Sequence, residues 1–202
     1  MDKIFKVNKK LSYCMAIITV VSLISGIMFT FILKESDYNK VTESLNTFME
    51  SVINNELNYG LSLKSNLVTN IIYVFIIWGL GISFIGLPII LFLYFIKVFS
   101  IGFTISSIML NYGLKGLVYS FIYIFPHNIL NVFIFGFLSL YSVIYSFRLS
   151  SSFFKKESID FKPILNKHKY VLLVALLGVI ITSLYGTYIM PYMLKIVLKF
   201  LK

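Results

Sequence analysis

The stretch from Asn66 to Phe147 constrains this chain most, because Lys97 and Lys115 are its only formal charges. Soluble domains carry roughly a quarter charged residues, whereas this chain is 13% charged and 58% hydrophobic. A segment this apolar is expected to lie in lipid, where the backbone must satisfy its own hydrogen bonds as helices. The sequence therefore predicts an all-α integral membrane protein, with no room for a soluble catalytic domain.

Five apolar runs are long enough to cross a hydrocarbon core of about 30 Å. We predict a single polytopic domain with spans at about 11–33, 67–86, 88–110, 117–147 and 170–192. Pro88 favours a helix start after a break at 86–88, although one long bent helix is an alternative. The run 117–147 would be about 46 Å long as a helix, so we expect it to break at Pro126. It forms either a kinked span or a re-entrant half-helix at 117–125 followed by a span.

Residues 34–66 form the only long polar segment, and acidic residues outnumber lysines in it. Apolar residues recur in it at helical spacing, namely Val41, Leu45, Phe48, Met49, Val52, Ile53 and Leu57. We predict an amphipathic helix that ends near Gly60 and lies on the membrane or against a partner. Packing of this helix on its own bundle is an equal alternative.

The charges at the ends of the runs predict an orientation. The basic segments 1–10 and 148–169 belong in the cytoplasm, and the acidic segment 34–66 belongs outside. The first run is expected to stay as an uncleaved anchor, because it is too long for a signal peptide and lacks an Ala-x-Ala site. Five spans then place the N-terminus in the cytoplasm and the C-terminus outside. The lysines near the C-terminus oppose this orientation weakly and are typical of an interfacial amphipathic turn.

Polar side chains inside the apolar runs are costly in lipid, so each is expected to serve packing or function. His127, Asn128 and Asn131 follow Pro126 within about one helical turn, where they can satisfy the backbone groups that the proline frees or form an ion path. Lys97 lies near mid-membrane and is expected to reach the interface or to face carbonyls freed near Pro126. The absence of carboxylates from 66–147 argues against a proton-coupled pump.

No catalytic, cofactor or metal site is expected. The lone Cys14 excludes an internal disulfide and a cysteine-based metal site. His168 falls in the basic 148–169 segment, where we expect it to be solvated. The glycines, among them Gly102, are expected to permit close helix packing. The net charge of +10 comes from lysines at the ends of apolar runs, so membrane lipid is an expected partner and nucleic acid is not.

Four motifs in a fixed order resemble the stage II sporulation protein M (SpoIIM) family. They are Pro88, Lys97-x-Phe99-Ser100-x-Gly102-Phe103-Thr104, Gly113-x-Lys115-Gly116 and Phe125-Pro126-His127-Asn128. Val98 stands where the family usually has glycine, and His127 where glutamine is common. The resemblance covers the whole chain in layout and is specific over 66–131. It implies a protein needed for engulfment, in a complex with sporulation proteins D and P, two cell-wall hydrolases outside the membrane.

The resemblance implies a membrane anchor or scaffold without enzymatic activity of its own. It would localise the hydrolases at the septal and engulfing membrane on the mother-cell side. We expect an apolar face of the 34–66 helix to contact a partner, through Leu45, Phe48, Met49, Val52 and Ile53. The alternative is a small-solute transporter or channel component built around Pro126 and Lys97. An internal repeat would favour a transporter, and the sequence shows none.

Overall fold

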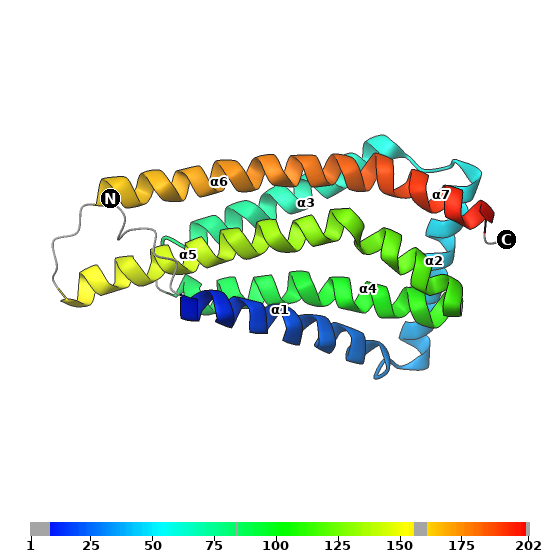
Figure 1. The fold of residues 1–202 in the computed structure, drawn as a ribbon, viewed down its shortest axis with the longest axis horizontal. Coiled ribbons are helices and arrows are strands. Elements are labelled where there is room, and N and C mark those ends of the chain that lie inside the picture. The colour runs from blue at the N-terminus through cyan, green and yellow to red at the C-terminus, as the bar shows by residue number, and fades with distance from the viewer. Residues whose placement is uncertain (1–8, 84, 156–160, 201–202) are drawn as a thin grey trace.

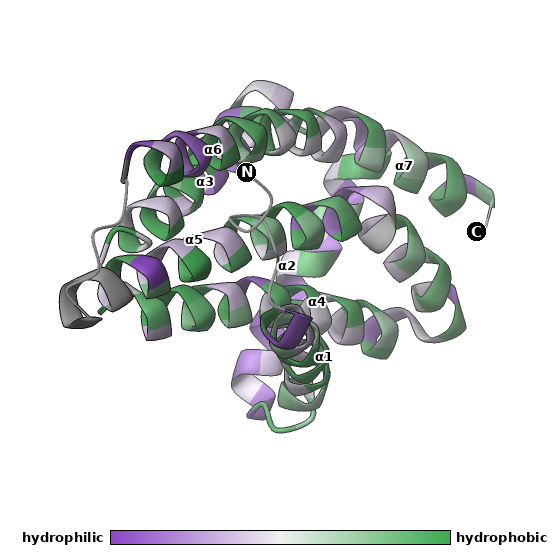
Figure 2. Cartoon of the chain, turned by 60° about the vertical axis from the view of Figure 1, so that its left-hand side comes forward, coloured by the Kyte–Doolittle hydropathy of each residue, from purple (hydrophilic) through white to green (hydrophobic). Residues whose placement is uncertain are grey.

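Long helices lie side by side in one bundle, as Figure 1 shows. The computed structural model describes residues 9–83, 85–155 and 161–200. Five helical segments are long and apolar enough to cross a membrane, namely Lys9–Thr30, Tyr59–Leu80, Gly86–Tyr123, Pro126–Ser150 and Lys162–Phe200. Figure 2 shows that hydrophobic residues cover most of these helices. The predicted all-α membrane fold is confirmed.

The elements follow in a simple order. They are α1 (Lys9–Thr30), α2 (Glu35–Asn54), α3 (Tyr59–Leu80), α4 (Gly86–Tyr123), the π-helical turn η2 (Ile124–Asn128), α5 (Ile129–Lys155), α6 (Phe161–Leu184), the π-helical turn η3 (Tyr185–Ile189) and α7 (Met190–Phe200). No residue separates α6, η3 and α7, so they form one continuous rod along the bundle (Figure 1).

The two ends of the bundle differ in structure and charge. One end, here the basic end, holds the starts of α1 and α6, the end of α5 and the turn between α3 and α4 (Figure 1). Basic residues gather there, namely Lys9, Lys10, Arg148, Lys162, Lys167 and Lys169. The other end, here the capped end, holds α2, α7 and a reversal within α4 (Figure 1). The 34–66 segment and the C-terminal helix therefore share one end, as the predicted order of spans requires.

The rod of α6, η3 and α7 is longer than a membrane is thick. The segment Lys162–Phe200 has 39 residues, which measure about 58 Å as a helix against a hydrocarbon core of about 30 Å. Lys169 is the last basic residue at the basic end, and about 20 further residues cross the core to Ile189. By this count α7 lies beyond the hydrocarbon, together with α2, which contacts α7.

The helix bounds differ from prediction around α2 and α3. The end of α2 is Asn54, followed by Asn55 in the left-handed conformation with φ 60°, so the predicted end near Gly60 is wrong. The next helix, α3, starts at Tyr59 rather than near 67, because the side chain of Asn58 accepts a hydrogen bond from the Leu61 N–H (3.1 Å). The change in polarity near residue 67 thus marks where the membrane ends, and α3 extends beyond it to Tyr59.

The break between α3 and α4 also lies earlier than predicted. The helix α3 ends at Leu80, and α4 begins at Gly86 with Pro88 in its first turn. Proline suits this position, because the first N–H groups of a helix have no partner in it. The expected role of Pro88 is confirmed, and the alternative of one long bent helix is wrong.

Within α4 the chain reverses at Gly113, which has φ 56° and ψ −133°. Glycine adopts a positive φ at little cost, because it has no Cβ. A Cβ on Gly116 would lie 2.6 Å from the Ile108 carbonyl oxygen, and the Ser120 hydroxyl donates to the Ile105 carbonyl (3.3 Å). Residues 114–123, here the return arm, therefore pack back on the long arm at 86–112. The reversal falls at 111–116, between the runs predicted at 88–110 and 117–147, where the two glycines and Lys115 indicate a turn.

The return arm continues through η2 into α5, so this rod is kinked at Pro126 as predicted. Proline lacks the N–H that would bond to the carbonyl four residues earlier, which favours such a local change of helix type. The segment 148–169, which we expected to be a loop between the spans at 117–147 and 170–192, is mostly helical, because α5 runs to Lys155 and α6 begins at Phe161. Basic residues mark the membrane boundary there, and the helices extend past it.

Two groups of buried side chains hold the structure together. The first lies inside the bundle and includes Val74, Ile77, Ile90, Phe135 and Leu138. The second, here the cap core, joins α2, both arms of α4 and α7 through Met49, Val52, Ile108, Tyr119, Ile122, Met190, Leu194 and Leu198. The capped end is therefore a packed unit rather than a set of loose segments.

Candidate functional site

Gly102 lies where α1 and α4 come closest. A Cβ on Gly102 would lie 2.4 Å from the Leu23 carbonyl oxygen, and one on Gly26 would lie 2.2 Å from the Phe99 carbonyl oxygen. Ser22, Gly26 and Thr30, spaced four residues apart, are the buried small residues of α1 at this contact. Small residues at such spacing let membrane helices approach closely. The packing role expected of Gly102 is confirmed.

Lys97 lies on α4, in the membrane-spanning part of the bundle. Its Nζ donates to Asn70 Oδ1 (2.7 Å) and lies 5.3 Å from the ring centre of Tyr73 and 5.0 Å from that of Phe135. An amide oxygen and aromatic faces are favourable partners for an ammonium group. Lys97 therefore meets side chains of α3 and α5, rather than the freed carbonyls or the interface that the sequence suggested.

His127 lies in η2 and packs on η3. A Cβ on Gly186 would lie 2.6 Å from His127 Nε2, so a larger residue there would displace the ring. Asn131 Oδ1 accepts from the Thr182 hydroxyl (2.8 Å), so the other end of that amide, Nδ2, faces His127 Nε2 (3.2 Å). The Thr182 hydroxyl also lies within hydrogen-bond distance of the Val179 carbonyl (3.2 Å), so this contact is compatible with a ring proton on either nitrogen of His127. Among the described residues, the Nδ1 of His127 has no hydrogen-bond partner, although it is buried.

Asn128, unlike His127, bonds to the backbone. Its side-chain amide donates to the Tyr123 backbone carbonyl (2.7 Å). That carbonyl belongs to the last residue of the return arm, just before η2. Asn128 thus bonds a carbonyl at the Pro126 kink, which is the packing role that its position predicted.

Further polar contacts extend the set along the bundle interior. Asn66 Nδ2 donates to the Thr187 hydroxyl (3.3 Å), and Asn70 Nδ2 donates to the Ser183 hydroxyl (3.4 Å). Together they form a polar ladder that joins α3, α4, α5 and α6, made of Asn66, Asn70, Lys97, His127, Asn131, Thr182, Ser183 and Thr187. The ladder runs from the membrane boundary at the capped end toward mid-membrane.

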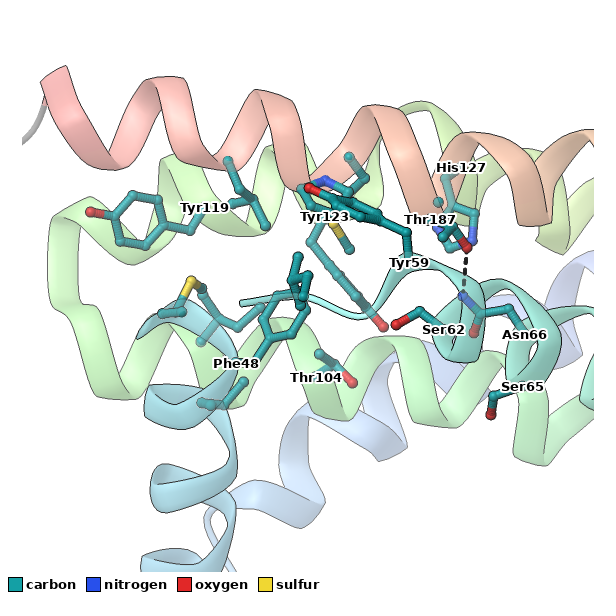
Figure 3. Close-up of a pocket in the computed structure, with 18 of the residues that line it drawn as sticks. Phe48, Tyr59, Ser62, Ser65, Asn66, Thr104, Tyr119, Tyr123, His127 and Thr187 are labelled. Carbon is teal, nitrogen blue, oxygen red and sulfur yellow. Dashed lines mark hydrogen bonds between the residues drawn. The ribbon is translucent and has the colours of Figure 1, made fainter. Parts of the chain in front are cut away.

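A cavity of about 620 Å³ lies at the end of this ladder that is nearest the capped end of the bundle. Its walls come from α2, α7, the start of α3, both arms of α4 and both π-helical turns. Figure 3 shows Ser62, Asn66, Thr187 and His127 together on one side and Phe48 and Tyr119 on the other. π-Helical turns often occur at functional sites. We therefore take this cavity, which described residues line, as the candidate binding site.

The apolar face of α2 turns toward this protein's own helices. Met49 and Val52 are 5% and 3% exposed and belong to the cap core. Leu45, Phe48 and Ile53 are half-buried and pack against the same core. Leu45, Phe48 and Met49 also line the cavity. For Met49 and Val52 the structure therefore agrees with the alternative prediction, in which the helix packs on its own bundle. These two residues do not offer a free surface to a partner.

His168 is not the solvated loop residue that we expected. It is 3% exposed and stacks between Trp78, at 5.1 Å, and Tyr145, at 4.3 Å between ring centres. Its Nε2 donates to the Trp78 carbonyl (3.0 Å), and the Trp78 indole N–H donates to the His168 carbonyl (3.0 Å). The prediction is wrong because α6 starts at Phe161, which places residue 168 on a helix face between α3 and α5.

Sequence reasoning found Lys97, His127 and Asn131 and missed most of their partners. Asn66 and Asn70 are spaced four residues apart, and so share a face of α3. The sequence indicated less clearly that three hydroxyl residues belong to the site, because hydroxyl groups are common in membrane helices. These residues are Thr182, Ser183 and Thr187. The described residues include no group of three or more His, Cys, Asp and Glu side chains that could hold a metal ion.

Comparison with known proteins identifies the family. The family model for SpoIIM, stage II sporulation protein M, matches residues 15–191. This range contains all five spans in whole or large part, the kink at Pro126 and the polar ladder. No curated protein and no solved structure matches the chain significantly. The chain therefore belongs to the stage II sporulation protein M family, and its apolar helices make it a sporulation-related membrane protein.

Proposed function

We propose that this protein is a membrane anchor and scaffold of the engulfment complex. It holds two peptidoglycan hydrolases, the sporulation proteins D and P, at the septal and engulfing membrane on the mother-cell side. The basic end lies in the cytoplasm and the capped end faces the wall, so the N-terminus is inside and the C-terminus outside. Family membership supports a role in sporulation, and the proposal adds the partners and the side of the membrane.

The observation that carries this proposal is the packed cap. At one end of the spans, α2, the return arm and α7 share a buried core, and the length of the α6–α7 rod carries this unit beyond the hydrocarbon. A folded unit tied to five spans suits an anchor, because a partner docked on it is held at a constant height above the bilayer. The basic residues at the opposite end favour the cytoplasm for that end.

The outward face of α2 is a part of the cap that remains open to a partner. Glu43, Thr47 and Glu50 are exposed on it, while Met49 and Val52 point into the cap core. The docking surface proposed here is therefore the exposed acidic face of α2. Half-buried Leu45, Phe48 and Ile53 form its apolar border.

Affinity purification of the tagged full chain from sporulating cells tests the partners directly. Recovery of both hydrolases is expected. Replacing Glu43 and Glu50 by lysine should reduce that recovery without lowering the amount of protein in the membrane. The matched control is Lys115→Glu, which changes an exposed charge at the capped end but outside α2. Unchanged recovery in the α2 variant would contradict the docking surface, and no recovery from the unaltered chain would contradict the scaffold.

Cysteine labelling tests the orientation separately. Cys14, the lone cysteine, is exposed on α1 near the basic end and is first replaced by serine. A cysteine at Thr47 should then react with a membrane-impermeant maleimide on intact protoplasts. A cysteine at Lys10, at the basic end, should react only after the membrane is opened. The reverse pattern would place the cap in the cytoplasm and remove the basis for contact with wall enzymes.

A small-solute transporter or channel component is the second candidate. The observation that favours it is the cavity of about 620 Å³ above a polar ladder that reaches Lys97. Against it, the bundle interior holds fully buried apolar side chains such as Val74, Ile77 and Phe135. Solute uptake by vesicles that contain the purified chain would favour this candidate over the scaffold.

A further inference from the structure

The cavity lies at the level where the hydrocarbon ends. On α6, about 20 residues from Lys169 lead to Ile189, next to Gly186 and Thr187 in the cavity wall. On α5, the same count back from Arg148 leads to Asn128, beside His127. Two helices thus place the polar side of the cavity at one membrane boundary, and the rest of the cavity lies in the cap beyond it.

The walls of the cavity carry no formal charge. Its lining consists of apolar, aromatic, hydroxyl and amide side chains plus His127, with no lysine, arginine or carboxylate. A charged ligand group would meet no opposite charge there, so nothing in the lining would compensate for the hydration that it gives up. The cavity therefore selects against anionic and cationic ligands.

Four polar side chains of the lining gather on one side of the cavity. Ser62, Asn66, His127 and Thr187 lie together on the side toward the bundle (Figure 3). On the side toward the cap, α2 and α7 supply Leu45, Phe48, Met49, Met190 and Leu194. The buried Nδ1 of His127 has no hydrogen-bond partner, so it calls for a polar ligand group, such as a hydroxyl, which can both donate and accept. A ligand that fits has a short uncharged oxygen-bearing group at one end and an apolar chain at the other.

We propose that this cavity binds an uncharged single-chain lipid, such as a monoacylglycerol. Its hydroxyl or ester oxygens lie beside Ser62, Asn66 and His127, and its chain extends into the cap between α2 and α7. A volume of about 620 Å³ is within the usual range of about 300–1,000 Å³ for small-molecule sites. The bound lipid points away from the bilayer centre, opposite to a lipid of the surrounding membrane. This site is independent of the scaffold role and of its protein partners.

Photo-labelling in vesicles tests the reversed orientation. The full chain is reconstituted with a monoacylglycerol that carries a diazirine at the end of its chain. The expected label lies on α2 and α7, because the chain end reaches the cap. A lipid of the surrounding membrane would instead label exposed mid-span residues such as Ile72 and Phe75 on α3. Label confined to such residues would overturn the proposal.

A cavity-filling variant and a charged analogue complete the test. Ser62→Phe places a ring in the cavity and should lower the cap label about tenfold, because the space is no longer free. Ser36→Phe, at an exposed position in the first turn of α2 and outside the lining, should leave it unchanged. The same probe with a phosphate head should label the cap about tenfold less. Equal cap labelling by both probes, or by the Ser62 variant and the unaltered chain, would overturn the site.

Discussion

The α1–α4 contact and the capped end are two contrasting ways of packing helices in one small protein. At the first, Gly26 and Gly102 let backbones touch, with no room for even one added carbon atom. At the second, two amphipathic helices and two π-helical turns surround a cavity of about 620 Å³. The difference teaches that this chain combines a tight seam, which holds α1 on the bundle, with a looser region that is suited to binding.

The solvent explains why the two regions are built differently. Inside hydrocarbon, apolar side chains gain little from leaving lipid, so helix association depends on van der Waals contact and small residues. Beyond the hydrocarbon, burial of Met49, Val52, Leu194 and Leu198 removes apolar surface from water, which is favourable by itself. The cap can therefore stay folded around a cavity, whereas the α1–α4 contact depends on close fit.

The largest expected effect is at the tight seam. Gly102→Leu should destabilise the folded protein by more than about 3 kcal/mol, because the new side chain meets the Leu23 backbone, which cannot move aside. Denaturant unfolding in detergent micelles measures the change. Gly79→Leu is the matched control, since a Cβ there meets nothing within 4 Å. Similar losses in both variants would mean that the seam is no tighter than the rest of the bundle.

The polar ladder should show the next largest effect. Asn70→Leu removes the oxygen that accepts from Lys97 Nζ, and we expect a loss of about 2–3 kcal/mol, because the ammonium group stays buried without it. The double variant Asn70→Leu with Lys97→Met should recover most of that loss. The same unfolding assay checks both. A double variant that is less stable than Asn70→Leu alone would show that Lys97 stabilises the fold through other contacts.

A smaller effect is expected where the two π-helical turns meet. Gly186→Ala should cost about 1–2 kcal/mol, because the added carbon displaces His127, the far end of a side chain that can shift, from Asn131. Adding His127→Ala should remove most of the penalty, and a double-mutant cycle measures this coupling. Strictly additive losses would contradict the contact between η2 and η3.

The smallest effect concerns the surface of the cap. Lys40 and Asp37 form the only salt bridge between described residues, at 3.4 Å, with side chains 77% and 52% exposed. Lys40→Ala should change stability by no more than about 0.5 kcal/mol, because exposed ion pairs contribute little. Unfolding measurements at low and high salt check this. A loss of more than about 1 kcal/mol would show that α2 relies on its surface charges to stay in place.

Several features of the fold and the site were predictable from particular residues. Pro88 and Pro126 predicted a helix start and a kink, because proline alters the backbone wherever it occurs. The segment 111–116, with its two glycines, predicted the reversal at Gly113. Lys97 and His127 were singled out because a polar group in an apolar run is costly. Asn70, Ser183 and Thr187 were not, since only the meeting of α3 and α6 makes them partners.

Several of the errors have one physical origin. The start of α3, the end of α5 and the start of α6 were placed where polarity changes, but hydrogen bonds along the backbone carry a helix past the membrane boundary. His168 was assigned to solvent for this reason, although α6 holds it between Trp78 and Tyr145. The apolar face of α2 was visible in the sequence, but its partner was not.

The sequence by itself determined that this chain has five runs long and apolar enough to cross a membrane and where it bends, because these depend on the solvation of each residue and on local backbone geometry. Tertiary structure alone decided that α7 covers α2, that Gly26 meets α4, and that polar groups from four helices form one ladder beside a cavity. Those contacts join residues that are far apart in the chain. Their free energy depends on how well the facing side chains fit and on the distances between them once the helices have packed.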